Sequence, residues 1–109
     1  MFLGTTITDR TNRITLIKIV AQILEIEEVG YIEFYKLEGN IILRKGTKEY
    51  KPNNKEPGFY MGTSTIDKDN RITIIELVTK HLQIKRGQRI DFFLTDKEIM
   101  IKQRNHDEK

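Results

Sequence analysis

Two polar turns in this chain carry cationic side chains whose spacing suits phosphate binding. Arg10 lies inside the first turn and Arg13 directly after it, and Lys68 and Arg71 hold the same places 58 residues further on. An arginine near the tip of a hairpin can bind a phosphate, or donate two hydrogen bonds to a guanine in the major groove of DNA. The spacing therefore indicates a contact with nucleic acid at both turns.

These residues also have a structural interpretation. Asp9 and Asp67 stand at the starts of the two turns, where each can pair with the arginine that follows. An isolated exposed cation inside a turn is often only solvated and contributes little to stability. Spacing alone leaves the DNA contact and the structural pair both open.

A further basic cluster is confined to the second half of the chain and consists of Lys80, Lys85, Arg86 and Arg89. The positions 58 residues earlier hold Gln22, Glu27, Glu28 and Tyr31, so the first half has no such cluster. A solvated charged face is the alternative to a DNA contact. If the cluster does bind DNA, the second half is expected to dominate the affinity.

The sequence has no pattern typical of a metal site or of a catalytic site. The chain has no cysteine, and His81 and His106 have no paired carboxylate at ligand spacing. The stretch 67–69 begins like a calcium loop but lacks the required glycine and the later glutamate. Ser64 has no local base and no nucleophile-elbow motif. We expect neither catalytic residues nor a metal or cofactor, and hence no enzyme.

Four aromatic side chains alternate with apolar neighbours in two short segments. They could stack on the bases of a single strand. The alternation with Ile32 and Ile90 is more typical of strands with one buried face. We therefore predict that these residues belong to the core: Phe34, Tyr35, Phe92 and Phe93.

Length and charge suggest a small soluble protein with a modest basic excess. The chain has 109 residues and a formal net charge of +3. Residues 4–45 carry six Lys/Arg against six Asp/Glu, whereas residues 62–103 carry eight against six. No apolar run approaches the roughly 18 residues that a membrane span needs, and the N-terminus lacks a signal-peptide pattern. A cytoplasmic protein without a membrane segment is expected.

The elements that must position the turns form a tandem repeat. At an offset of 58 positions, residues 4–45 align with 62–103 without a gap, and 14 of the 42 aligned positions are identical. We divide the chain into a first repeat (1–45), a linker (46–61), a second repeat (62–103) and a polar tail (104–109). A unit of this size lies near the lower limit for independent folding, so the two repeats are expected to share one core.

Each repeat has the pattern strand, strand, helix, strand, strand. In the first, strands are predicted at Thr5–Asp9 and Arg13–Leu16, flanking a turn whose Asp and Asn suit tight backbone geometry. Apolar residues at i, i+3 and i+7 then predict a short helix over 17–24. Two further strands centre on 32–34 and 41–43.

The second repeat resembles the AbrB/MazE/SpoVT family of DNA-binding proteins. The resemblance rests on STIDKDNRITI at 64–74 and LQIKRGQRIDF at 82–92, separated by the helix. It covers the first repeat more loosely, through residues such as Asp9, Asn12 and Arg13. Where the family commonly has proline before the helix this chain has isoleucine, and the paired helix arginines are absent, with Thr79-Lys80 in their place.

The resemblance implies a mainly β protein with short helices, built as a swapped-hairpin barrel in which two ββαββ units interleave. Here one chain would supply both units as an intramolecular pseudo-dimer. It also implies a double-stranded DNA-binding transcriptional regulator, with these candidate contacts: Arg10, Arg13, Lys68, Arg71 and Lys80. Further pairing of pseudo-dimers stays open. The rival expectation is a protein-interaction or assembly module with the same barrel and no DNA readout; an antitoxin role is less favoured.

Overall fold

The described part of the chain consists of residues 1–26, 29–52 and 56–104 of a computed structural model. The remaining residues include Glu27 and Glu28 and all of the predicted tail beyond Arg104. The elements are, in order, β1 (Phe2–Ile7), β2 (Arg13–Thr15), α1 (Lys18–Ile23), β3 (Gly30–Leu37), β4 (Asn40–Gly46), β5 (Phe59–Ile66), β6 (Arg71–Thr73), α2 (Glu76–Leu82), β7 (Arg89–Thr95) and β8 (Glu98–Arg104). Both halves thus carry the predicted element order, and the mainly β class with two short helices is confirmed.

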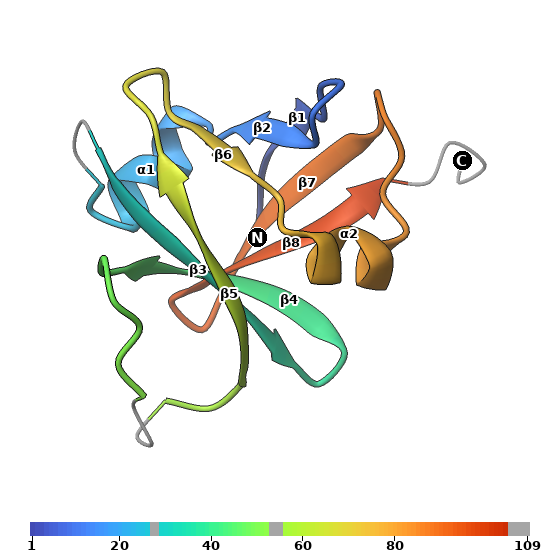
Figure 1. Cartoon of the computed structure of the whole chain (residues 1–109). Coiled ribbons are helices and arrows are strands. Elements are labelled where there is room, and N and C mark those ends of the chain that lie inside the picture. The colour runs from blue at the N-terminus through green and yellow to red at the C-terminus, as the bar shows by residue number, and fades with distance from the viewer. Residues whose placement is uncertain (27–28, 53–55, 105–109) are drawn as a thin grey trace.

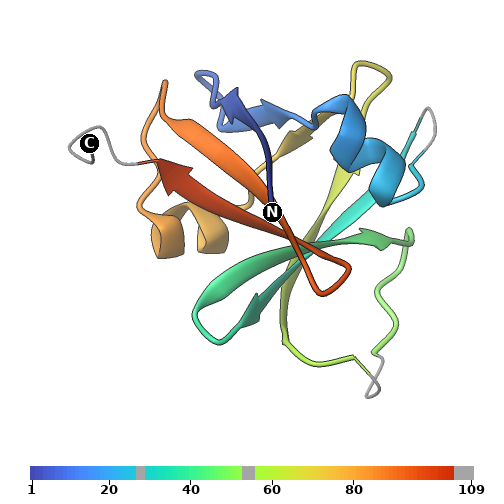
Figure 2. The same ribbon diagram turned by 180° about the vertical axis from the view of Figure 1, so that it is seen from behind.

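The strands of the two halves interleave in one antiparallel sheet (Figures 1 and 2). Its order is β1-β7-β8-β4-β3-β5, so the first strand of each half pairs with the third strand of the other. β1 runs against β7, β5 runs against β3, and the two hairpins β3–β4 and β7–β8 join through β4 and β8. Neither half could complete this sheet without the other.

A separate two-stranded ribbon, β2–β6, lies at the top of the molecule in Figure 1. Ile14 pairs with Ile72 at its centre, and the pairing continues past both ends through Leu16 N to Asn70 O (2.7 Å) and Ile74 N to Asn12 O (2.8 Å). The ribbon therefore has the same hydrogen bonds on both sides of its midpoint. This arrangement places the two polar turns at its opposite ends.

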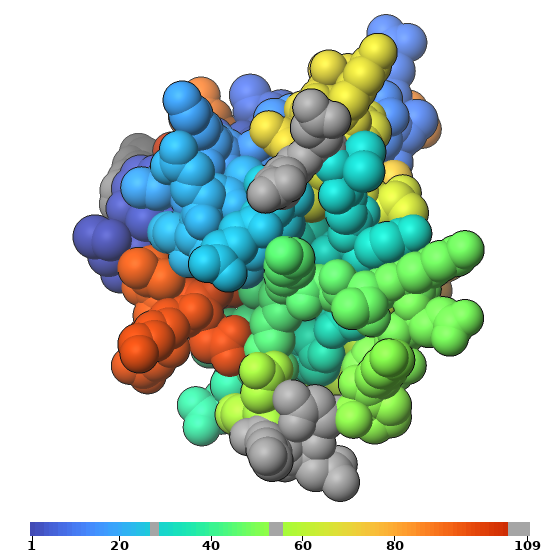
Figure 3. Space-filling view, turned by 90° about the vertical axis from the view of Figure 1, so that its left-hand side faces the viewer, coloured from blue at the N-terminus to red at the C-terminus, as the bar shows by residue number. Residues whose placement is uncertain are grey.

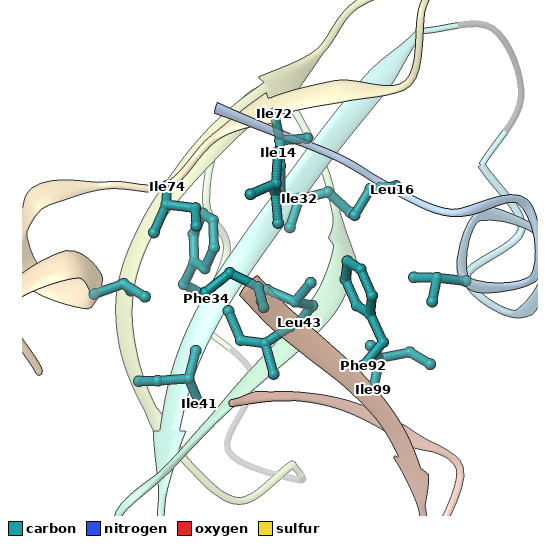
Figure 4. Close-up of a cluster of buried hydrophobic side chains, with 14 of the residues drawn as sticks. Ile14, Leu16, Ile32, Phe34, Ile41, Leu43, Ile72, Ile74, Phe92 and Ile99 are labelled. Atoms are coloured by element: carbon teal, nitrogen blue, oxygen red, sulfur yellow. The ribbon is translucent and has the colours of Figure 1, made fainter. Parts of the chain in front are cut away.

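The core fills the space between the ribbon and the sheet (Figure 4). Ile14 and Ile72 point inward from the ribbon and are each 1% exposed, and Phe34 and Phe92 are fully buried below them. Alternation along the strands explains this, because every second side chain of a strand faces the same side. Of the four aromatics predicted as core, Tyr35 is also buried and Phe93 is partly exposed.

Both helices are short and are kept in place by packing. Ile17 and Ile75 precede them in extended conformation without a side-chain cap, and each helix buries a valine, Val20 or Val78. A helix of six or seven residues is marginal alone, so burial of these faces stabilises it. Within the described ranges, no helix has the length and apolarity required to cross a membrane.

The strand boundaries differ from the predicted ones. β1 begins at Phe2 and ends at Ile7, whereas a strand over Thr5–Asp9 was expected. The reason is tertiary, because pairing with β7 extends from Phe2 to Ile7 and recruits residues without a periodic pattern. β5 likewise begins at Phe59, inside the predicted linker, because it pairs with β3.

Candidate nucleic-acid interface

The two turns have the same internal hydrogen bonds. In the first, Oδ1 of Asp9 accepts from the backbone N–H groups of Thr11 (2.8 Å) and Arg13 (3.0 Å), and Asn12 adopts a left-handed φ of 59°. In the second, Asp67 and Asn70 do the same, with the same φ of 59° at Asn70. Each is a tight turn that includes a left-handed asparagine and joins strands of two different sheets, and it confirms the predicted roles of Asp and Asn.

These hydrogen bonds keep both aspartates ionised. Backbone donation from Arg13 and then from Thr11 lowers the pKa of Asp9 to about 2. Donation from the backbone of Arg71 is the main reason that the pKa of Asp67 is also lowered. Both carboxylates therefore serve the turn itself, because a carboxylate that accepts backbone N–H bonds favours its charged form.

The outward face of the ribbon presents Arg13, Thr15, Arg71 and Thr73, since the side chains between them, Ile14 and Ile72, point into the core. The two arginines lie diagonally across this face, because Arg13 pairs with Thr73 and Arg71 with Thr15. Sequence analysis placed these arginines near two separate turns. The structure brings them together on one ribbon.

The two arginines are unequally available. Nε of Arg13 lies 3.5 Å from Asp9 and Nη1 lies 3.9 Å from Asp67, so the expected structural pairing is present at this position. Arg71 is exposed and forms no ion pair among the described residues. The turn cations Arg10 and Lys68 are also exposed. Arg10, Lys68 and Arg71 are therefore the better candidates for an external anion.

The loop 83–88, which joins α2 to β7, lies against the first turn. Thr8, only 2% exposed, exchanges backbone hydrogen bonds with Gln88 and Gly87, and its hydroxyl donates to the carbonyl of Lys85 (3.0 Å). Figures 1 and 2 both show this loop and the first turn reaching the same end of the molecule. Lys85 and Arg86, from the second half, thus belong to a loop that is hydrogen-bonded to Thr8, two residues before Arg10 in the first half.

This neighbour relation changes the expected distribution of charge. The second half was expected to dominate the affinity through its basic cluster, but the crossed strand pairing sets Lys85 and Arg86 of that cluster on a loop that is hydrogen-bonded to the first half. The first turn, with Thr11 where the second has Asp69, gains Lys85 and Arg86 as neighbours. Figure 3 shows the second turn (yellow) projecting at the top of the molecule, with first-turn residues (blue) behind it.

Lys80 lies away from this face. It forms an ion pair with Glu76 at 3.0 Å on the exposed side of α2. The same helix contacts the β3–β4 turn through His81, whose Nε2 lies 2.8 Å from the carbonyl oxygen of Gly39. Of the five candidate residues, four lie at the turns or on the ribbon and Lys80 does not.

Sequence reasoning did not find that Thr8 joins the first turn to the loop 83–88. The partners are about 80 positions apart in the chain and come from different repeats. A threonine before an aspartate carries no local signal for such a contact. Among the described residues, no group of histidine, aspartate and glutamate side chains is arranged to hold a metal ion.

No protein-family model matches the chain, and no curated protein sequence is significantly similar to it.

Proposed function

We propose that this protein is a double-stranded DNA-binding transcriptional regulator of AbrB-like type, a single-chain pseudo-dimer that contacts DNA through the β2–β6 ribbon and its two turns. The observation that carries the proposal is the joint exposure of Arg10, Lys68 and Arg71 on one end of the molecule. The acidic neighbours Asp9 and Asp67 are engaged by the turn backbones. By formal charge, Asp9, Asp67 and Asp69 offset three of the four cations at the turns and on the ribbon. Lys85 and Arg86 on the neighbouring loop add two more positive charges, so the face has a net positive charge.

The crossed strand pairing supports the same proposal. In a swapped-hairpin barrel each unit contributes strands to the other, and here β1 pairs with β7 while β5 pairs with β3. This exchange of strands between the halves, together with the ribbon β2–β6, is what the family resemblance leads us to expect. The linker joins the two units, so the pseudo-dimer needs no second chain.

A two-stranded ribbon is an element that can enter a groove of DNA. The major groove of B-DNA, ~12 Å wide, admits a two-stranded β-ribbon. In that orientation Arg71 faces the base edges, and Arg10, Lys68, Lys85 and Arg86 face the phosphates. Phosphate contacts position the protein and base contacts supply the sequence preference.

If the proposal is right, DNA affinity falls steeply as the salt concentration rises, and it falls when Arg71 is replaced. With four cations at phosphates, log K should fall with log salt at a slope of about −3.6 on a mixed-sequence duplex, because counterions are released. Arg71→Gln should weaken binding about tenfold. Lys97→Gln, in the β7–β8 turn, is the matched control and should change little. Fluorescence anisotropy measures both, and equal losses would indicate nonspecific charge.

A second pair of variants tests the unequal ends. Lys85→Gln with Arg86→Gln should lower the salt slope by about 2, because two phosphate contacts are lost next to the first turn. Lys80→Gln should leave the slope unchanged, since that charge pairs with Glu76. No binding by the wild type at low salt and micromolar protein would contradict the proposal as a whole.

An interaction or assembly module is the second candidate, and one observation favours it. Arg13 is engaged by Asp9 and Asp67, so one of the two ribbon arginines has little charge to offer a phosphate. The ultraviolet spectrum of the purified protein discriminates the candidates. Co-purified nucleic acid supports the regulator, and a spectrum of pure protein together with failed anisotropy titrations supports the module.

A further inference from the structure

The outer sides of the two halves carry the same aromatic pair. Tyr35 and Tyr60 meet edge to face, with ring centroids 5.7 Å apart and planes at 63°. Phe93 and Phe2 meet in the same way at 5.6 Å and 65°. The offset of 58 relates Tyr35 to Phe93 and Phe2 to Tyr60. The same contact is therefore built twice.

The Tyr35–Tyr60 pair, formed between β3 and β5, is covered by the segment between β4 and β5. Tyr50 stacks on Tyr60 with centroids 3.6 Å apart and planes within 8°. Further along the segment, the carbonyl of Pro57 accepts a hydrogen bond from Arg44 (2.8 Å), and Glu56 lies 3.7 Å from the same guanidinium. An aromatic ring, a carboxylate and a backbone carbonyl together dock this piece of polypeptide.

The docked segment binds to a cation that sits over the first aromatic ring. The guanidinium of Arg44 lies 4.3 Å from the centroid of Tyr35, and Glu98 holds it from the other side at 2.6 Å. Arg44 is nearly buried as a result. The covered face is thus an aromatic pair with an adjoining cation whose charge is satisfied by carboxylates.

The equivalent face at β1, β7 and β8 is here called the Phe2 face and consists of Phe2 from the first half and Phe93, Lys102 and Arg104 from the second. Phe2 is 52% exposed, and no aromatic ring of the described residues stacks on its free side. Lys102 replaces Arg44 and lies 5.9 Å from the Phe93 centroid. Figure 2 shows the N-terminal end of β1 on the side facing the viewer, beside β7 and β8.

The cations of the Phe2 face are not neutralised as Arg44 is. The position that corresponds to Glu98 is Asn40, and Lys102 has no ion pair among the described residues. Arg104 is held by Asp91 at 3.1 Å and reaches the Phe2 ring only to 6.0 Å. This leaves an exposed ring beside an exposed ammonium group.

We propose that the Phe2 face docks an extended polypeptide segment of a partner protein, one that carries an aromatic side chain to stack on Phe2 and a carboxylate to pair with Lys102. The same two contacts are made on the equivalent face, where Tyr50 stacks on Tyr60 and Glu56 pairs with Arg44. A second copy of this chain fits less well, because the Lys102 and Arg104 of one face would meet those of the other. The surface lies apart from the ribbon, so the inference does not depend on DNA binding.

The test uses the full-length protein labelled for NMR and a blocked synthetic peptide with the sequence of residues 48–58, KEYKPNNKEPG. Titration to a few millimolar should produce saturable shifts at the amides of Phe2, Phe93 and Lys102, since a short docked segment binds weakly. A peptide with Tyr50→Ala should lose at least about fivefold in affinity, as expected for one stacked aromatic pair.

Variants of the protein test whether the peptide binds at the Phe2 face. Phe2→Ala should weaken peptide binding by about fivefold, whereas Leu77→Ala, an equally exposed apolar change on α2, should not. Lys102→Gln in the protein and Glu56→Gln in the peptide should each weaken binding, and together no more than either alone. A variant that ends at Arg104 should still bind, which excludes dependence on the tail.

Three outcomes would overturn the inference. One is the absence of shifts at the highest peptide concentration. Another is shifts at Tyr35 and Tyr60, which would mean that the peptide only displaces the chain's own segment. The third is a set of Phe2-face shifts produced by a single-stranded oligothymidylate at lower concentration than by the peptide, which would make the surface a base-stacking site.

Discussion

Arg13 and Arg71 show how one residue type at equivalent positions takes on different roles. Arg13 lies between two carboxylates, Asp9 and Asp67, whereas Arg71 is exposed with no ion pair in the described part of the chain. The backbone pairing of the ribbon is the same around both arginines, so the difference lies in where each guanidinium is placed. Equivalent sequence positions therefore do not ensure equivalent availability.

Arg44 is held by Glu98 and Pro57 through hydrogen bonds from Nε and Nη2, and among the described residues its Nη1 has only the ion pair with Glu56. Its hydrogen bonds to Glu98 raise the pKa of the guanidinium, and the side chain is 10% exposed. Arg44→Ala should lower the free energy of unfolding by about 2 kcal/mol, because a partly buried carboxylate loses its partner. Lys102→Ala, the equivalent but exposed change, should cost less than about 0.5 kcal/mol. Urea unfolding measures both, and similar costs would contradict this account.

Asp9 predicts a pH dependence of stability. Its pKa in the folded protein is lowered to about 2, so the stabilisation is present above the usual aspartate value of 3.8 and is lost as pH falls toward 2. Asp9→Asn keeps an oxygen acceptor in the turn but does not titrate. Between about pH 4 and pH 2 the wild type should lose more stability than this variant. If the urea midpoints of the wild type and of Asp9→Asn change equally across that range, the folded protein does not favour the ionised form of Asp9.

At the scale of elements, the side chains of the ribbon β2–β6 alternate between the core and the surface. Its inner residues close the core and its outer residues present charge. Ile72→Ala should therefore lower the free energy of unfolding by about 3 kcal/mol, because a side chain 1% exposed leaves a cavity. Thr73→Ala, on the outer side of the same strand, should change it by less than about 0.5 kcal/mol. Thermal unfolding of the two variants checks the contrast, and equal effects would mean that the ribbon does not seal the core.

Local chemistry predicted some elements better than others. The turns were predicted well, since Asp and Asn act through their own backbone and the next few residues. The helices also follow from spacing, with Val20 and Val78 buried as expected. The start of β5 was missed because Phe59 and Tyr60 become strand only through pairing with β3.

At the scale of the whole molecule, the two halves depend on one another. Pairing across β1–β7, β3–β5, β2–β6 and β4–β8 means that each half provides hydrogen-bond partners for the other. The described linker residues between β4 and β5, 47–52 and 56–58, lie outside this strand pairing and contact the fold through Tyr50, Glu56 and Pro57. The stability of the fold should therefore survive loss of chain continuity.

Cleavage in the linker tests this dependence. A protease site introduced at 47–49 and cut in the folded protein should leave the two fragments in one particle on gel filtration. They should separate only on denaturation, because the shared core holds them together. After denaturation each isolated fragment should show a spectrum typical of an unfolded chain, and mixing should restore the β signal. Fragments that separate without denaturant, or fold alone, would contradict the interleaved arrangement.

The sequence by itself determined the units of this protein. The constant offset of 58, the alternation of apolar residues and the Asp–Asn turns were enough to predict two similar β-rich halves with exposed cations at their turns. These are local properties, because backbone preference and side-chain periodicity depend on near neighbours. The candidate cations Arg10, Lys68 and Arg71 were found in this way.

Only the tertiary structure decided which units meet. The crossed pairing sets Lys85 and Arg86 beside the turn of the other half, places Arg13 between two carboxylates and leaves Lys80 on a separate helix. It also covers one aromatic pair with the linker and exposes its counterpart at Phe2. The physical reason is that strand partners are selected by burial of a shared core, a property of the whole chain that no short segment encodes.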